Sequence, residues 1–158
     1  MRRLFSHLLK ARSCDKPFNI DLHRLVRELT KDQQLIRPFY YTSFNPDNAA
    51  QVAFLERLEL TDFHVIRTPL RRRGEVLVEK GVDVALVTDL LAYAFRKAYD
   101  LAIIVSGDSD FLNAIKEVMR LGIQLHIACF KANASREMKS AGDLFIPLDS
   151  LAEQVEKK

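Results

Sequence analysis

The hydrophobic positions of this chain follow two patterns, one typical of helices and one of buried strands. One helical face consists of apolar residues three or four positions apart, namely Leu22, Leu25, Val26 and Leu29. Asp21 precedes this face and can cap the helix. Residues 101–105 and 123–128, in contrast, are apolar almost throughout, which is typical of strands covered by helices on both faces. The pattern predicts an α/β domain with a parallel, doubly wound sheet.

The same reasoning extends along the whole chain. The expected strands are 35–42, 64–68, 101–105, 123–129 and 144–147. The expected helices are 2–11, the segment around 22–29, 47–59, 82–99, 109–121 and 135–140. Pro38 favours an edge position or a bulge for the first of these strands, and Pro69 with the Arg71–Gly74 run indicates a loop. No repeat or linker interrupts the pattern, so residues 1–158 form one expected domain.

The start of the chain does not fit this scheme. Doubly wound sheets usually open with a central strand whose carboxyl end supplies part of the ligand site, whereas this chain opens with an expected helix at 2–11. We therefore expect the first central strand to be missing. A sheet without it leaves backbone groups of its neighbours unpaired, which predicts low stability.

Composition excludes several classes of protein. With 158 residues, 48% hydrophobic and 28% charged, the chain can bury a core and is neither disordered nor fibrous. No apolar run approaches the roughly 20 residues of a membrane-spanning helix, and no export signal is recognisable. Cys14 and Cys129 form no zinc or disulfide pattern. A cytoplasmic location without membrane association is expected, and self-association of the chain stays open.

The charges are distributed unevenly. Residues 1–73 hold 14 Lys and Arg against 8 Asp and Glu, whereas residues 74–158 hold 10 against 13. A basic part joined to an acidic part suits a polyanionic partner beside a carboxylate site. Uneven solvation of the surface explains the same numbers.

The strongest candidate for chemistry is the sequence Ser106-Gly107-Asp108-Ser109-Asp110, which follows the expected strand 101–105. It brings two carboxylates to the carboxyl end of a buried parallel strand, where open α/β sheets bind their ligands. Such hard oxygen ligands suit Mg²⁺ or Mn²⁺. The alternative is that Asp108 or Ser109 only caps the following helix.

Two further acids occur in the expected helix 82–99. Asp83 and Asp89 are six residues apart, hence separated by about 120° around the helix and about 9 Å along it, so they cannot easily share one ion. Asp83 is the better metal-ligand candidate, with favourable helix-start electrostatics as the alternative. Asp89 either supports the site or belongs to a solvated stripe. Lys80 either contacts a phosphate or is an exposed charge.

Basic and aromatic residues complete the candidates. Arg71, Arg72 and Arg73 form the densest positive cluster, and guanidinium groups match phosphate oxygens well. A solvated charge run is the alternative. Tyr40, Tyr41 and Phe44 could stack on bases, although aromatic residues of a strand more commonly pack in the core.

Three segments together resemble the NYN domain family, the LabA-like branch of the PIN-like nucleases. They are Glu79-Lys80-Gly81-Val82-Asp83-Val84-Ala85-Leu86 with Asp89, Val105-Ser106-Gly107-Asp108-Ser109-Asp110-Phe111, and Ala141-Gly142-Asp143-Leu144-Phe145-Ile146. The resemblance implies a three-layer α/β/α PIN-like (Rossmannoid) fold and RNA cleavage with Mg²⁺ or Mn²⁺. Asp83, Asp108 and Asp110 would then be the metal-binding and catalytic acids, with Asp89 in support.

The chain departs from the family pattern at two places. Asn113 stands where members usually carry a proline. The Asp-x-x-Asn-type motif that ends the family's first strand, and supplies a central metal-binding aspartate, is not found.

These observations favour a metal-dependent ribonuclease, with reduced activity because one aspartate is lacking. The basic cluster, Lys80, Ser106 and Ser109 would contact the RNA. A catalytically inactive RNA-binding or protein-interaction module is the alternative. A haloacid-dehalogenase-like phosphatase is a third reading, disfavoured because no Asp-x-Asp-x-Thr loop is present.

Overall fold

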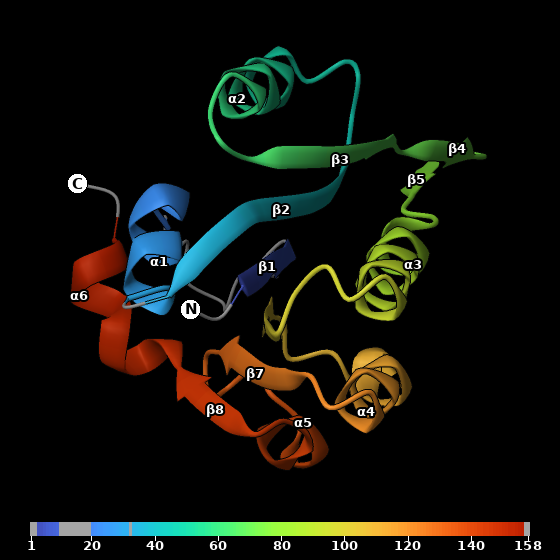
Figure 1. The fold of residues 1–158 in the computed structure, drawn as a ribbon. Helices are drawn as coiled ribbons and strands as arrows, with labels where there is room; N and C mark the ends of the chain where they lie inside the picture. Colours follow the sequence, from blue (N-terminus) through green and yellow to red (C-terminus); the bar gives the residue numbers. More distant parts are fainter. Residues whose placement is uncertain (1–2, 10–19, 32, 157–158) are drawn as a thin grey trace.

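The computed structural model describes residues 3–9, 20–31 and 33–156 and contains a six-stranded, wholly parallel sheet in the order β3-β2-β1-β6-β7-β8 (Figure 1). Its strands are β1 (Arg3–Leu9), β2 (Gln34–Phe44), β3 (His64–Pro69), β6 (Leu101–Val105), β7 (Gln124–Cys129) and β8 (Leu144–Pro147). The parallel sheet expected from the apolar strands is confirmed.

Helices cover both faces of the sheet. One face carries α1 (Leu22–Leu29), α2 (Ala49–Glu59) and α6 (Ala152–Val155), and the other carries α3 (Val82–Phe95), α4 (Leu112–Arg120) and α5 (Arg136–Ala141). β6 is fully buried because its residues alternate between the two layers. Leu101, Ile103 and Val105 pack with α1 and α6, whereas Ala102 and Ile104 pack with α3 and α4. The expected three-layer α/β/α arrangement is therefore confirmed.

β1 corrects the prediction for the start of the chain. Residues 3–9 form a strand, not part of a helix at 2–11, and this strand lies between β2 and β6. The central place of the sheet is thus filled, and the expectation of a missing first strand is wrong. The reason is tertiary: strands on both sides present backbone groups that need partners, and an extended segment between them pairs with both. The argument for low stability no longer applies.

β2 also differs from expectation. It is an interior strand, so the edge position inferred from Pro38 is wrong. The bulge is confirmed, because Leu4 pairs with Leu35 but Phe5 pairs with Arg37, which leaves one residue of β2 unmatched. Pairing with β3 begins only at Phe39, one residue after Pro38. The proline therefore lies where β2 has a single paired neighbour.

The Arg71–Gly74 run is not a loop but the start of a hairpin. β4 (Arg71–Arg73) pairs antiparallel with β5 (Val76–Val78), and the two strands are joined by Gly74 and Glu75. Gly74 has a φ of 65°, a left-handed conformation that glycine adopts without strain. All six strand residues are exposed, and the hairpin projects from the domain between β3 and α3 (Figure 1).

Helix boundaries shift by a few residues from those expected. α2 begins after Asn48, whose side chain accepts a hydrogen bond from the backbone N–H of Gln51 at 3.0 Å. α3 ends at Phe95 rather than residue 99, since Lys97 has a φ of 53°. The expected helix 109–121 is a 3₁₀ turn, η1 (Ser109–Phe111), followed by α4. A second 3₁₀ turn, η2 (Leu148–Leu151), leads into α6.

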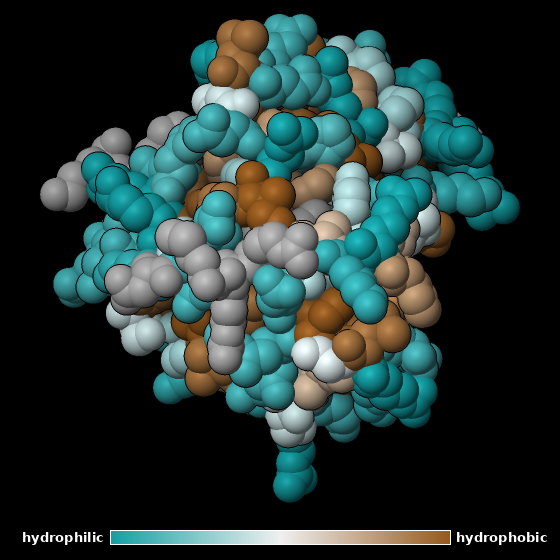
Figure 2. Space-filling model, viewed as in Figure 1, coloured by the Kyte–Doolittle hydropathy of each residue, from teal (hydrophilic) through white to brown (hydrophobic). Residues whose placement is uncertain are grey.

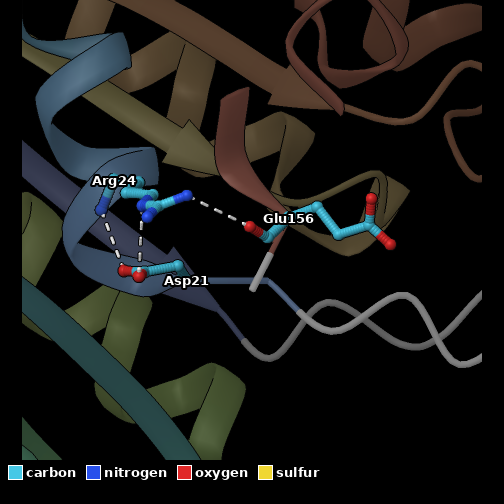
Figure 3. Close-up of polar contacts among 3 residues, drawn as sticks. All are labelled: Asp21, Arg24 and Glu156. Carbon is cyan, nitrogen blue, oxygen red and sulfur yellow. Dashed lines mark hydrogen bonds and ion pairs between the residues drawn. The ribbon is translucent and has the colours of Figure 1, made fainter. Parts of the chain in front are cut away.

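The C-terminal segment is fastened to the start of α1 (Figure 3). The Asp21 carboxylate caps α1 by accepting from the Arg24 N–H at 3.1 Å, and it also lies 3.5 Å from Nε of Arg24. The Arg24 guanidinium donates to the backbone carbonyl of Glu156 at 3.4 Å, and Ile20 forms an isolated antiparallel bridge with Glu156. In the described part of the chain, no helix has the length and apolar character needed to cross a membrane.

Candidate functional site at the carboxyl edge of the sheet

The sheet reverses its direction of growth between β1 and β6. From β1 the chain adds β2 and β3 on one side, then crosses over through α3 and adds β6, β7 and β8 on the other side. In open α/β sheets, ligands bind at the carboxyl ends of the strands at such a switch point. The loop that follows β6 starts at this point and contains Asp108 and Asp110.

Hydrogen bonds within this loop fix its acidic residues. The Asp108 N–H donates to Oγ of Ser106 at 3.1 Å, and Oδ1 of Asp108 accepts from the Asp110 N–H at 3.0 Å. Phe111, which follows, is almost completely buried and anchors the turn. Asp108, Ser109 and Asp110 are exposed. The capping role considered for Asp108 is therefore real, and it engages one of the two carboxylate oxygens.

Gly107 holds the loop against the next one. A Cβ at this position would lie 2.1 Å from the Asn133 carbonyl oxygen and 2.8 Å from Sγ of Cys129. Only glycine allows the loops after β6 and β7 to approach this closely. Burial raises the pKa of the Cys129 thiol, so this cysteine is a packing residue in its neutral form.

The first turn of α3 lies at the same edge of the sheet. α3 leaves this edge and returns to the opposite one, where β6 begins, so Asp83 in its first turn belongs to the carboxyl side. Asp83 is exposed, and so is Lys80 just before the helix. Among the described residues, however, no three His, Cys, Asp or Glu side chains group closely enough to hold a metal ion. Asp83, Asp108 and Asp110 share an edge without forming a three-carboxylate cluster.

Asp89 is paired with a residue that the sequence did not associate with it. The hydroxyl of Tyr41 donates to Oδ2 of Asp89 at 2.9 Å. Tyr41 is completely buried and Asp89 half-buried. Burial raises the pKa of Tyr41, and the hydrogen bond to Asp89 adds to the effect. Asp89 therefore does not lie on a solvated stripe.

The register shows that this pair lies close to the carboxyl edge. Leu8 of β1 pairs both with Tyr40 and with Val105, so Tyr41 lies one residue beyond the last residue of β6. The Tyr41–Asp89 bond is consequently level with the start of the acidic loop. No local signal joins two residues 48 positions apart, which is why sequence reasoning missed it.

Ser43 is a second residue that the sequence did not single out. It lies two residues beyond Tyr41 on the same face of β2, is 2% exposed, and its Oγ has no hydrogen-bond partner in the described structure. A buried hydroxyl without a partner is unfavourable by about 1–3 kcal/mol. In the described structure, β2 thus carries an unpaired, buried hydroxyl close to its carboxyl end.

The basic residues divide into exposed and engaged ones. Arg71, Arg72 and Arg73 are exposed on β4, and hydrophilic atoms dominate the projecting hairpin at the right margin of Figure 2. Arg67, in contrast, forms an ion pair with Glu59 at 3.2 Å and lies 5.5 Å from the centre of the Phe44 ring. Arg67 is therefore held in place by Glu59 and Phe44, whereas the three hairpin arginines are exposed.

Two features lie away from this edge. Asp143 and Leu125 exchange hydrogen bonds of 2.8 Å at the amino end of β7, so Asp143 joins β7 to the segment before β8. A depression of about 340 Å³ lies between the amino end of β2 and residues 61–63, also at the amino side of the sheet. Neither contributes to the acidic edge.

The donor chemistry at the edge fits a divalent cation that keeps much of its water. Mg²⁺ is commonly bound by one or two carboxylates together with waters and substrate phosphates. Asp110 and the second oxygen of Asp108 are exposed and of this type. β1 contains no Asp or Glu, so the central aspartate implied by the family resemblance has no counterpart in that strand. The residues fit an open, hydrated site and not a closed carboxylate cage.

The fold and the edge define a PIN-like α/β/α domain with an acidic loop at its switch point. The NYN domain family model matches residues 8–149, and the chain belongs to this family, whose members are generally nucleases. The crystal structure of a protein of unknown function from Vibrio parahaemolyticus is similar, with a TM-score of 0.78 and 19% identity over 94% of this chain and 93% of that one. This likeness supports the fold. No curated protein matches the sequence.

Proposed function

We propose that this protein is a ribonuclease that depends on Mg²⁺ or Mn²⁺ and cleaves RNA phosphodiester bonds at the carboxyl edge of its sheet. The observation that carries the proposal is the acidic loop after β6, where Asp108 and Asp110 are exposed at the switch point of a fold whose family consists generally of nucleases. RNA is the proposed substrate because the basic hairpin next to this edge suits a polyanion.

Asp108 and Asp110 are the residues that would hold the cation, with Asp83 as an additional acid from α3. A bound divalent ion supplies charge neutralisation at the scissile phosphate and lowers the pKa of a bound water. The chain itself contributes orientation. Asp108 keeps one carboxylate oxygen on the Asp110 N–H, which fixes the direction of the other oxygen. Tyr41 fixes the Asp89 carboxylate in the same way.

RNA would be bound by basic and hydroxyl groups around the loop. Arg71, Arg72 and Arg73 are the proposed contacts to the phosphate backbone, together with Lys80. Oγ of Ser106 accepts a hydrogen bond from Asp108, which leaves its own hydrogen available for a phosphate oxygen. Ser109 is exposed one residue further along.

Cleavage of a labelled RNA in the presence of Mn²⁺ or Mg²⁺ tests the proposal. Asp110→Asn is the informative variant because it removes a charge from an exposed side chain and keeps its size. Asp62→Asn is the matched control, since Asp62 is also exposed but lies at the amino side of the sheet. We expect cleavage by the wild type and by the control, its loss on chelation, and a decrease of at least about 100-fold in Asp110→Asn, as for other removed catalytic groups.

Binding is measured separately with the same RNA. Replacing the three hairpin arginines by glutamine should weaken binding and reduce the slope of log affinity against log salt by up to about 2, since each lost contact to single-stranded RNA removes about 0.7. An unchanged slope would remove the hairpin from the proposed interface.

A catalytically inactive RNA-binding module is the second candidate. It is favoured by the lack of a carboxylate in β1 and by the absence, in the described residues, of three acids grouped for a metal. RNA binding by the wild type without cleavage at any Mn²⁺ concentration would select this function over the nuclease.

A further inference from the structure

We propose that the outer face of α3 is a dimer interface, on which a second copy of this chain packs with its own α3 in antiparallel orientation. This inference concerns assembly and stands independently of the proposed nuclease activity.

α3 is apolar on two opposite faces. Its inner face is buried against the sheet and α4 through residues four positions apart, Val82, Leu86, Leu90 and Ala94. Its outer face continues the apolar character, with Val84 69% and Phe95 66% exposed. A helix that is hydrophobic all round is normally buried all round.

The outer residues form one continuous stripe. Val84, Thr88, Leu91 and Phe95 follow each other at intervals of four, three and four residues, which places them on the same side of the helix. Val84, Thr88 and Phe95 are exposed, whereas Leu91 is half-buried and also packs against the core. The hydroxyl of Thr88 donates to the Val84 carbonyl at 2.7 Å. Because the helix itself satisfies this hydroxyl, the stripe needs no water at its only polar position.

The projecting hairpin extends the apolar surface beyond the start of α3. Val76, Leu77 and Val78 of β5 are exposed, and only three residues separate β5 from the start of α3. Of the nine large hydrophobic side chains found exposed in the described structure, five lie between residues 76 and 95. Such clustering marks an interaction surface, whereas scattered exposed hydrophobic residues do not.

The charges at the two ends of α3 identify the partner. At its start, the exposed charges are those of Glu79, Lys80 and Asp83, so that acids outnumber bases, whereas Arg96 and Lys97 are exposed just after its end. An antiparallel copy brings Glu79 and Asp83 of each chain toward Arg96 and Lys97 of the other, and it also opposes the two helix dipoles. A parallel arrangement would bring like charges together. The stripe itself has no Lys or Arg, so it does not suit RNA.

A single two-fold interface would cover both the outer face of α3 and the apolar strand of the hairpin. In an isologous dimer the same patch serves both copies. Val84 of one copy then lies near the partner's Phe95, and the hairpin, at the start of α3, lies beside the end of the partner's α3. The two acidic edges come to opposite ends of the paired helices.

Sedimentation velocity of the full chain over a range of concentrations tests the interface. We expect a dimer for the wild type and at least about a tenfold weaker association for Val84→Glu and Phe95→Glu. Leu60→Glu is the control, because Leu60 is 87% exposed on the other side of the domain, at the end of α2. All three sites are exposed, and circular dichroism should show folded protein in each case. A monomeric wild type, or equal weakening in the control, would overturn the proposal.

Mixed disulfides test the orientation. Chains carrying Val84→Cys are mixed with chains carrying Phe95→Cys under mild oxidation. We expect cross-linked heterodimers to exceed both homodimers, because the antiparallel pairing brings residue 84 to the partner's residue 95. Predominance of disulfides between two Val84→Cys chains would overturn the antiparallel arrangement. A loss of RNA binding in Val84→Glu with no change in sedimentation would assign the stripe to RNA instead.

Discussion

The bond between Tyr41 and Asp89 provides the sharpest prediction. Tyr41→Phe removes only the hydroxyl that donates to Oδ2 of Asp89 at 2.9 Å and leaves the buried ring in place. A hydrogen bond to a charged group contributes about 1.5–3 kcal/mol. Because Asp89 is half-buried and water can replace the phenol in part, we expect the lower value, about 1.5 kcal/mol. In a domain of this size that lowers the melting temperature by about 3–6 °C.

Tyr99→Phe is the matched control. The hydroxyl of Tyr99 is also buried, but it donates to the neutral backbone carbonyl of Leu90 at 2.8 Å and lies away from the acidic edge. Its loss should lower the free energy of unfolding by about 0.5–1.5 kcal/mol and leave RNA cleavage unchanged. Tyr41→Phe should also lower cleavage, because the Asp89 carboxylate loses its fixed orientation. Equal effects of both substitutions on cleavage would refute the positioning role of Tyr41.

Measurements at alkaline pH distinguish the contribution of the Tyr41 phenol to the free energy of unfolding from other contributions. Burial raises the pKa of Tyr41 above the ordinary value of 10.0, so above about pH 10 the unfolded chain releases a proton that the folded chain keeps. The folded state binds more protons, and the free energy of unfolding therefore falls as the pH rises. Tyr41→Phe removes one such group, and its stability should fall less steeply, by up to about 1.4 kcal/mol per pH unit. Denaturant titrations at successive pH values measure both slopes, and equal slopes would contradict the assignment.

Two further substitutions test the carboxyl edge. Gly107→Ala forces a Cβ to within 2.1 Å of the Asn133 carbonyl oxygen, so it should lower stability by about 1–3 kcal/mol, displace the acidic loop and thereby reduce cleavage. Gly142→Ala is the control, because its Cβ would lie 2.6 Å from a backbone oxygen at the opposite end of the sheet. It should lower stability but leave cleavage unchanged when both variants are assayed below their melting temperatures. Ser43→Ala removes a buried hydroxyl without a partner and should raise the free energy of unfolding by about 1 kcal/mol, whereas Thr42→Val, which loses a 3.0 Å bond to the Ser43 carbonyl, should lower it. Calorimetric shifts of the same sign for both would contradict this reading.

Some elements could be predicted because their cause is local. The run 101–105 is apolar at every position, and a strand of this kind needs cover on both faces, which the structure provides. The Asp108 cap was readable from a strand followed by Ser, Gly and Asp. The hairpin also has a local signal, because Gly74 and Glu75 lie between an arginine run and a segment with two valines, Val76 and Val78.

Other features depend on contacts between residues far apart in the sequence, so no short stretch of sequence predicts them. Residues 3–9 have apolar residues at positions compatible with a helix. They form a strand because β2 and β6 offer backbone hydrogen-bonding groups on both sides of this segment. Asp89 was assigned to a solvated stripe or a supporting role because its partner, Tyr41, comes from a different layer. Asp143 belongs to a motif of the family resemblance, yet its hydrogen bonds join β7 to the segment before β8, at the amino end of the sheet.

The acids of the carboxyl edge differ in whether their carboxylates also make structural hydrogen bonds. Asp108 caps the 3₁₀ turn through Oδ1, and Asp89 accepts from a buried phenol, so substitution of either changes the fold together with the chemistry. The backbone of Asp110 takes part in the cap, but its exposed carboxylate receives no hydrogen bond in the described structure. A change confined to the Asp110 charge therefore alters the edge electrostatically with little effect on stability. Loss of cleavage in Asp110→Asn at unchanged melting temperature would thus report on chemistry, a distinction that the other acids do not offer.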